Sequence, residues 1–148
     1  MRLQAQQHQT VLHRVQQSIL VRYVKIPTSS DDRAETVPTT EKQFNLANRL
    51  VSDLKEIGVT DVQVDEMCYV YAHIPASEGL EKKDRIGFIA HVDTSPDFAD
   101  SPVNVNIIEN YDGSDVILGN SGRAITNANF PHLASLKGKT LVTTDGHT

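Results

Sequence analysis

The stretch Arg85–Phe98, which reads RIGFIAHVDTSPDF, decides the fold that we expect for this chain. Its first half, Arg85–His91, is an apolar run with polar ends, which is typical of a strand buried on both faces of a sheet. His91 and Asp93 follow where the backbone is about to turn, and the carboxyl ends of such strands are where α/β sheets place ligands. The stretch therefore predicts a buried strand with a ligand site at its carboxyl end.

Two helices are predicted on the amino-terminal side of this strand. From Val11 the apolar residues recur at helical spacing, and this stripe ends before the turn-forming residues 27–40. We interpret residues 27–40 as a surface connector rather than a mobile lid. The next helix is expected to begin with Thr40 as its N-cap and Gln43 in a capping box, and to end at Gly58.

Several short strands accompany the helices, because short segments show strand alternation or apolar runs bounded by turn residues. These strands are expected at Val62–Val64, Met67–Ile74, Val103–Ile108, Val116–Leu118 and Thr140–Thr144. Helices followed by several strands predict an α/β fold in which the helices pack on a mixed β-sheet. We expect residues 1–10 to be a polar, disordered start and residues 11–148 to form the folded domain.

The composition fits a globular domain that binds neither nucleic acid nor membranes. Hydrophobic residues make up 39% of the chain, and the formal net charge of -5, with no basic run, argues against nucleic acid and anionic membranes as partners. No apolar run approaches the roughly 20 residues that cross a bilayer, and the glutamine-rich start lacks the apolar core of a signal peptide. The single cysteine, Cys68, is expected to be buried in a strand, and a lone thiol suits a reducing, cytoplasmic location.

His91 and Asp93 form the sharpest local signal for metal chemistry. Because residues alternate along a strand, the two side chains are expected to point the same way. The imidazole of His91 can then bind zinc, while the Asp93 carboxylate hydrogen-bonds the other ring nitrogen and fixes the tautomer. The pattern H-x-D is common, however, and a histidine at a strand end is more often structural. Asp93, followed by Thr94 and Ser95, can equally cap a turn, so both interpretations stay open on these residues alone.

Other histidine and acidic residues offer weaker metal signals. Asp145 and His147 form a second pair separated by one residue, Asp97 and His132 are also available, and His73 lies in an apolar strand that favours a structural role. The sequence contains no H-E-x-x-H pattern, no glycine-rich phosphate loop and no serine or cysteine nucleophile motif.

The longer stretch IGFIAHVDTSPDF resembles the first metal-site segment of the peptidase T family, which belongs to the dinuclear-zinc exopeptidases and deacylases. Other segments resemble the same family in the same order, so that the resemblance covers nearly the whole chain from about Val15. These segments are RYVKIPTSSD, VPTTEKQFNLANRLVSDLKEIGV, VNVNIIENYDGSDVILG and TLVTTDGHT. The long forms HVDTSPDF and ENYDGSDVILG are much more specific than H-x-D. They favour the tripeptidases of this superfamily over its deacetylases and carboxypeptidases.

The resemblance implies a metallo-aminopeptidase, a hydrolase that releases the N-terminal residue from tripeptides. It implies that His91 is a ligand of one of two Zn²⁺ ions, and that Asp93 is the catalytic aspartate, which orients His91 without binding the metal. In such an enzyme the two zinc ions lower the pKa of a bridging water, so that a hydroxide attacks the scissile carbonyl. A glutamate then transfers the proton to the departing amine.

The same resemblance implies that residues 11–148 are the N-terminal part of a zinc-peptidase catalytic domain, a fragment of the complete enzyme. In the family, a G-A-D-D-K-A-G type segment with a bridging aspartate, two glutamates, a further aspartate and a distant histidine complete the site. An inserted domain typical of the family forms a homodimer. None of these segments is present in the 148 residues. We therefore expect the chain alone to be inactive. The alternative is a non-catalytic scaffold or binding module that keeps the fold without zinc chemistry.

Overall fold

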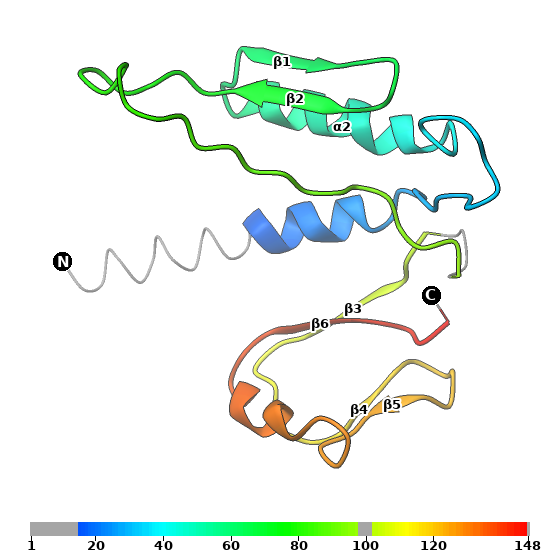
Figure 1. The fold of residues 1–148 in the computed structure, drawn as a ribbon. Helices are drawn as coiled ribbons and strands as arrows, with labels where there is room; N and C mark the ends of the chain where they lie inside the picture. Colours follow the sequence, from blue (N-terminus) through cyan, green and yellow to red (C-terminus); the bar gives the residue numbers. More distant parts are fainter. Residues whose placement is uncertain (1–14, 98–101, 148) are drawn as a thin grey trace. The chain divides into compact units, whose positions relative to one another are not determined.

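The computed structural model describes residues 15–97 and 102–147, which belong to two compact units. One unit consists of Pro27–Asp100, and the other of Met1–Ile26 with Ser101–Thr148. Figure 1 traces the chain through both units by colour. The polar start at 1–10 and the helical residues expected before position 15 lie outside the described residues, whereas residues 15–23 are helical as predicted.

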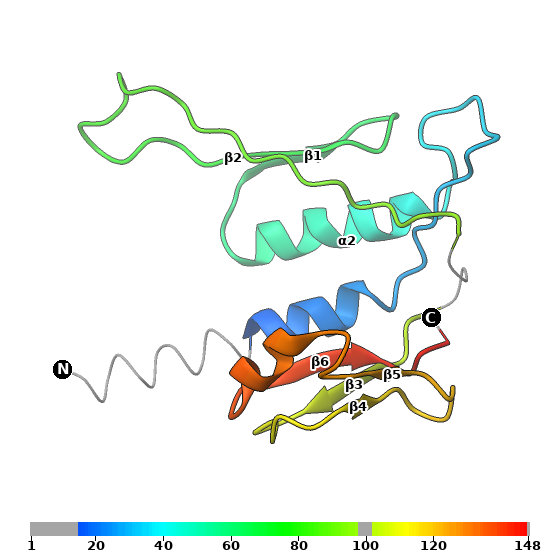
Figure 2. The same cartoon turned by 60° about the horizontal axis from the view of Figure 1, so that its bottom comes forward.

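A helix and a hairpin build the unit Pro27–Asp100. Its elements are α2 (Gln43–Glu56), β1 (Asp61–Val64) and β2 (Val70–His73), and the two strands pair antiparallel. The helix buries Leu46 and Ala47 and packs along the hairpin, as both Figure 1 and Figure 2 show. The apolar stripe of the helix thus meets the half-buried valines of β1, and each element removes the other's apolar face from water.

The carboxyl end of α2 lies where the sequence predicts it. Gly58 has a φ of 94°, a left-handed conformation that glycine adopts without steric cost. The N–H groups of Gly58 and Val59 donate to the carbonyl groups of Lys55 and Leu54, each at 3.0 Å. This is a Schellman arrangement, and it satisfies two carbonyl groups that the helix leaves unpaired.

The capping box predicted at the amino end of α2 is wrong. The N-cap is Lys42, and no side chain caps the helix. The Thr40 hydroxyl donates instead to the Ser29 carbonyl at 2.8 Å, and the Gln43 side-chain amide donates to the Thr39 hydroxyl at 3.1 Å. A partner 11 residues away has therefore taken the hydroxyl that the local pattern assigned to the helix.

Cys68 lies in the turn between β1 and β2, whereas the sequence predicts it in a strand. The cysteine is buried, as expected, but it lies in the turn with a φ of 67° rather than in a strand. Asp65 organises this turn, because its carboxylate accepts the N–H groups of Met67 at 3.0 Å and Tyr69 at 2.8 Å. β2 consequently begins at Val70, later than the strand that the sequence predicts.

The largest departure from the sequence prediction concerns Arg85–His91, which forms no strand. No backbone hydrogen bond joins this segment to another among the described residues. Ile86, Phe88 and Ile89 are exposed, the last two almost completely, at 96% and 102%. A strand buried on both faces needs a partner at each edge and a layer on each face. The described residues supply neither, so the apolar composition alone does not produce the strand.

The second unit contains short elements around a small core. They are the helix at 15–23, β3 (Val105–Ile108), β4 (Val116–Ile117), β5 (Ala124–Ile125), the 3-10 helix Pro131–Leu136 and β6 (Leu141–Thr144). β3 pairs with β6 and β4 pairs with β5, both antiparallel, and Figure 2 shows the two pairs and the 3-10 helix. Tyr111, Val116 and Leu133 form the buried core. The sequence predicts β3, β4 and β6, but not β5 or the 3-10 helix.

The predicted mixed β-sheet is also wrong for the described residues, whose six strands form three separate antiparallel pairs. Parallel pairing is limited there to one isolated bridge between Ser29 and Thr94. Among the described residues, Arg85–His91 has no strand partner, and each of the three pairs is a separate two-stranded sheet. The class therefore remains a mixture of helices and strands, with small antiparallel sheets in place of a single one.

Among the described helices, none has both the length and the apolar character that a membrane span requires.

Candidate metal centre

The structure brings the side chains of His91 and Asp93 into contact. His91 Nδ1 lies 3.1 Å from Asp93 Oδ1 and 3.0 Å from the Asp93 carbonyl oxygen. Both partners are hydrogen-bond acceptors, so Nδ1 must carry the proton in the neutral ring. The lone pair of the imidazole is then on Nε2. The His91 side chain is 86% exposed and that of Asp93 is 42% exposed, so Nε2 is open to a ligand from solvent.

This arrangement fits one ligand of a zinc ion together with its orienting partner. Zinc ligation by histidine commonly pairs one ring nitrogen with the metal and the other with a carboxylate or carbonyl oxygen, and Asp93 supplies both oxygens. A catalytic zinc ion, however, generally has three protein ligands. Within residues 15–97 and 102–147, no group of three or more histidine, cysteine, aspartate or glutamate side chains is arranged to hold a metal. The described residues thus fit part of a zinc site.

A parallel bridge to Ser29 fixes the backbone immediately after Asp93. The Thr94 N–H donates to the Thr28 carbonyl at 3.2 Å, and the Ser30 N–H donates to the Thr94 carbonyl at 3.0 Å. The Ser30 hydroxyl donates a second bond to the Thr94 carbonyl at 3.1 Å. Thr28 and Ser29 are buried, at 4% and 6% exposed. No local sequence pattern predicts this contact, because it joins segments 64 positions apart.

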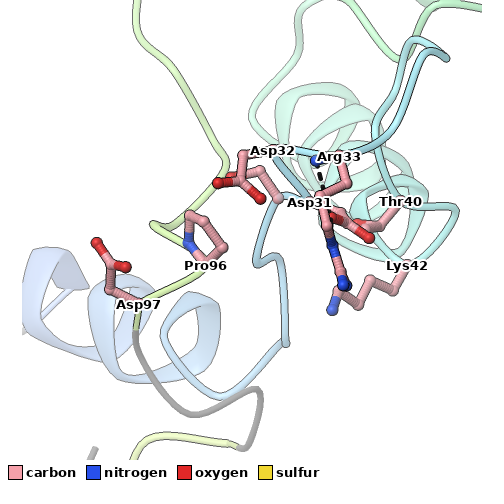
Figure 3. Close-up of a pocket in the computed structure, with 8 residues that line it drawn as sticks. Asp31, Asp32, Arg33, Thr40, Lys42, Pro96 and Asp97 are labelled. Carbon is pink, nitrogen blue, oxygen red and sulfur yellow. Dashed lines mark hydrogen bonds and ion pairs between the residues drawn. The ribbon is translucent and has the colours of Figure 1, made fainter.

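An open pocket of about 390 Å³ lies beside this bridge. Its lining is polar and charged, as Figure 3 shows, and consists of Ser30, Asp31, Asp32, Arg33, Thr40, Lys42, Pro96 and Asp97. The Arg33 N–H donates to the Asp31 carboxylate at 3.0 Å, and Arg33 Nε does so at 3.3 Å. First the backbone bond and then the side-chain bond hold the pKa of Asp31 below its ordinary value. Asp31 is therefore ionised at neutral pH and offsets the Arg33 charge.

The other residues that the sequence offers as metal ligands have different partners. His73 Nδ1 lies 3.5 Å from Asp61 Oδ2 across the β1–β2 pair, and His147 Nε2 lies 3.2 Å from Asn120 Oδ1. Asp145 accepts a bond from Asn104 at 2.8 Å. Two residues remain. Asp97 accepts a bond from the Ser95 hydroxyl at 3.1 Å, and the rings of His132 and Phe130 form a T-shaped pair with centroids 6.2 Å apart. Each of these contacts is accounted for by the surrounding chain without a metal.

Comparison with known proteins gives one consistent set of relatives, although no protein-family profile matches the chain. Peptidase T of Clostridium acetobutylicum is 45% identical over 130 residues, which is 86% of this chain and 31% of that protein. Peptidase T of Geobacillus thermodenitrificans is 48% identical over 128 residues, again 86% of this chain and 31% of the relative. Peptidase T of Aliivibrio fischeri is 48% identical over 126 residues, which is 85% of this chain and 31% of that protein. This chain is therefore a homologue of peptidase T that spans about a third of the length of the curated relatives it matches.

Proposed function

We propose that this chain provides the first metal-ligand segment of a zinc aminopeptidase that removes the N-terminal residue from tripeptides. The observation that carries the proposal is the contact of His91 Nδ1 with two oxygens of Asp93, within a chain homologous to peptidase T. In this role His91 binds zinc through Nε2, and Asp93 holds the ring and its tautomer in place. When bound, zinc would supply Lewis-acid activation of water and of the scissile carbonyl.

The remaining ligands of the two-zinc site are proposed to lie outside the described residues. One histidine and one orienting carboxylate do not make a catalytic site, and the described residues offer no larger group. We therefore expect the 148-residue chain to show no turnover of trialanine with added zinc. Turnover at the rate of a complete peptidase T would contradict this expectation.

A chimeric enzyme tests the proposed roles directly. The matching third of the Geobacillus thermodenitrificans relative is replaced by this chain, and zinc-dependent hydrolysis of trialanine is measured. Hydrolysis is expected in the chimera and is expected to be lost on His91→Ala. Since the family assignment makes Asp93 an orienting residue rather than a ligand, Asp93→Asn should lower kcat even when enough zinc is added to keep the site loaded. Circular dichroism and zinc content establish that each variant is folded and loaded.

Two results would overturn the proposal. The first is a folded, zinc-loaded chimera in which His91→Ala retains full activity, because the residue could not then be a ligand. The second is a folded chimera that binds two zinc ions but cleaves no tripeptide. That result would favour the non-catalytic binding module, with which one histidine ligand and its orienting carboxylate in the described residues are also compatible.

A further inference from the structure

The segment that carries His91 and Asp93 is anchored to the rest of its unit at one point. Among the described residues of the range 85–97, Thr94 is the one whose backbone hydrogen-bonds to a distant segment. Residues 85–91 are exposed, with His91 itself at 86% side-chain exposure, and Val92 and Asp93 are half-buried. Whatever fixes Thr94 therefore limits how far Asp93, and through it His91, can move.

The anchor on the other side of the bridge is itself held by side chains. Ser29 is buried, and its carbonyl accepts the Thr40 hydroxyl at 2.8 Å while its own hydroxyl accepts Lys42 Nζ at 2.8 Å. The Asp31 N–H donates to the Thr39 hydroxyl at 3.2 Å. The residues that lead into α2 thus hold the strand-like segment Thr28–Ser30 from one side. Thr94 pairs with that segment from the other.

We propose that Ser30 and Thr40 are positioning residues for the candidate metal centre, which they hold through Ser29 and Thr94. Ser30 bonds the Thr94 carbonyl through both its N–H and its hydroxyl, and Thr40 fixes the buried Ser29 carbonyl next to it. The chain of hydrogen bonds runs from the start of α2 through Ser29 and Thr94 to Asp93, whose oxygens select the Nδ1–H tautomer of His91. The metal-binding role of His91 rests on the function proposed above, whereas the positioning itself is a property of the metal-free chain.

The test uses the metal-free 148-residue chain and two pairs of variants. Thr40→Val removes the hydroxyl at nearly constant shape, and Thr40→Ser retains it. Ser30→Ala and Ser30→Thr form the second pair. Ser52→Ala is the control, because its hydroxyl bonds the Asn48 carbonyl within α2, away from the bridge. Hydrogen exchange of the Thr94 and Ser30 amides reports the bridge, and the ring ¹⁵N shifts of His91, at one fixed pH, report its tautomer.

In the unsubstituted chain, Nδ1–H is expected to be the major tautomer of His91. Thr40→Val and Ser30→Ala should accelerate exchange of the Thr94 amide about two- to tenfold, the effect of one lost hydrogen bond. They should also shift His91 towards the Nε2–H tautomer. Thr40→Ser, Ser30→Thr and Ser52→Ala should leave both measurements unchanged. If one hydroxyl-deleted variant loses its helical circular dichroism, the comparison uses the pair of variants at the other position.

Unchanged exchange and tautomer in both hydroxyl-deleted variants would overturn the positioning role. Equal changes in amide exchange and tautomer on Ser52→Ala would also overturn it, since they would reflect a general loss of stability rather than loss of the bridge. Zinc titration of the unsubstituted chain separates this proposal from the proposed function. If zinc leaves the His91 ring signals unmoved while the variants shift the tautomer, the metal role fails and the positioning role stands. If zinc binds at His91 and the variants change nothing, the reverse holds.

Discussion

At the scale of single residues, the His91–Asp93 pair has a geometric basis that the pattern H-x-D only suggests. Asp93 offers a carboxylate oxygen and a backbone carbonyl oxygen to the same ring nitrogen, at 3.1 and 3.0 Å. Two acceptors at one nitrogen leave one neutral tautomer compatible with both bonds. A second histidine–aspartate contact, in which one carboxylate oxygen of Asp61 lies 3.5 Å from His73 Nδ1, serves as an internal control.

Asp93→Asn is expected to weaken zinc binding at His91 about 10–100-fold, the usual cost of losing an orienting partner of a ligand. The measurement is a zinc titration of the 148-residue chain, in which the NMR signals of the His91 ring report binding. Asp61→Asn makes the same change beside His73 and should leave the titration unaltered. Equal affinities in the Asp93→Asn and unsubstituted chains would argue against the orienting role.

Cys68 is expected to react slowly with alkylating reagents in the folded chain. Burial, with the nearby negative charges of Asp65 and Glu41, raises the pKa of the thiol above its ordinary value of 9.0. The thiolate is the reactive form, so iodoacetamide at about pH 8 should modify folded Cys68 several-fold more slowly than Cys68 in urea. The raised pKa also means that this group's contribution to stability is present below pH 9.0 and is lost as pH rises through the folded pKa. Equal alkylation rates in the two states would contradict the burial.

At the scale of elements, the ends of α2 show which local signals determine structure. Gly58 ends the helix because no other residue adopts its left-handed φ without cost, and two backbone bonds depend on that conformation. The threonine that the pattern assigns to the amino end bonds a different segment. A steric requirement is therefore read correctly from the sequence, whereas the partner of a hydroxyl is not.

Gly58→Ala is expected to lower the free energy of unfolding by about 1–2 kcal/mol, the cost of a left-handed conformation for a residue with a Cβ. Gly87→Ala is the matched control, because Gly87 has no positive φ and its added Cβ would meet no atom within 4 Å. That control should change the free energy by less than about 0.5 kcal/mol. Urea unfolding followed by circular dichroism gives both values, and equal values would show that the φ of Gly58 is not needed.

The segment Arg85–His91 gives a sharp contrast between a sequence prediction and the structure. If Phe88 were in a buried strand, Phe88→Ser would cost about 3–5 kcal/mol of stability. With the side chain 96% exposed, the same change should cost less than about 0.5 kcal/mol. It should also reduce concentration-dependent association in sedimentation experiments, since an unpaired apolar segment is prone to pair between molecules. A loss of several kcal/mol on Phe88→Ser would instead support the predicted buried strand.

At the scale of the whole molecule, stability rests on two small cores rather than on one sheet. Leu46 and Ala47 are buried in the unit Pro27–Asp100, and Tyr111, Val116 and Leu133 in the other. No side chain in the described residues is buried to less than 2% exposure apart from Ala47. Each core is therefore close to the surface, and a single truncation removes a large share of it.

Leu133→Ala is expected to destabilise the second unit by about 2–5 kcal/mol, since the side chain is buried against Tyr111 and Val116. Leu80→Ala makes the same truncation at a half-exposed position and should cost less than about 0.5 kcal/mol. Hydrogen exchange of β3 and β6 amides gives the local effect. If the amides of β3 and β6 exchange at the same rates in both variants, Leu133 does not belong to a core.

The sequence by itself determined the features that depend on neighbouring residues: the presence of helix α2 and its end at Gly58, the strands β1, β3, β4 and β6, and the placement of Asp93 beside His91, two residues away. The homology to peptidase T likewise follows from the order of residues. The tertiary structure decided which group each hydroxyl hydrogen-bonds and which segments pair with another strand. Thr40 and Ser30 join segments far apart in the chain, and Arg85–His91 has strand composition but no neighbour among the described residues. A conformational preference is local, whereas a hydrogen bond or a buried face exists only where a second segment supplies the other half.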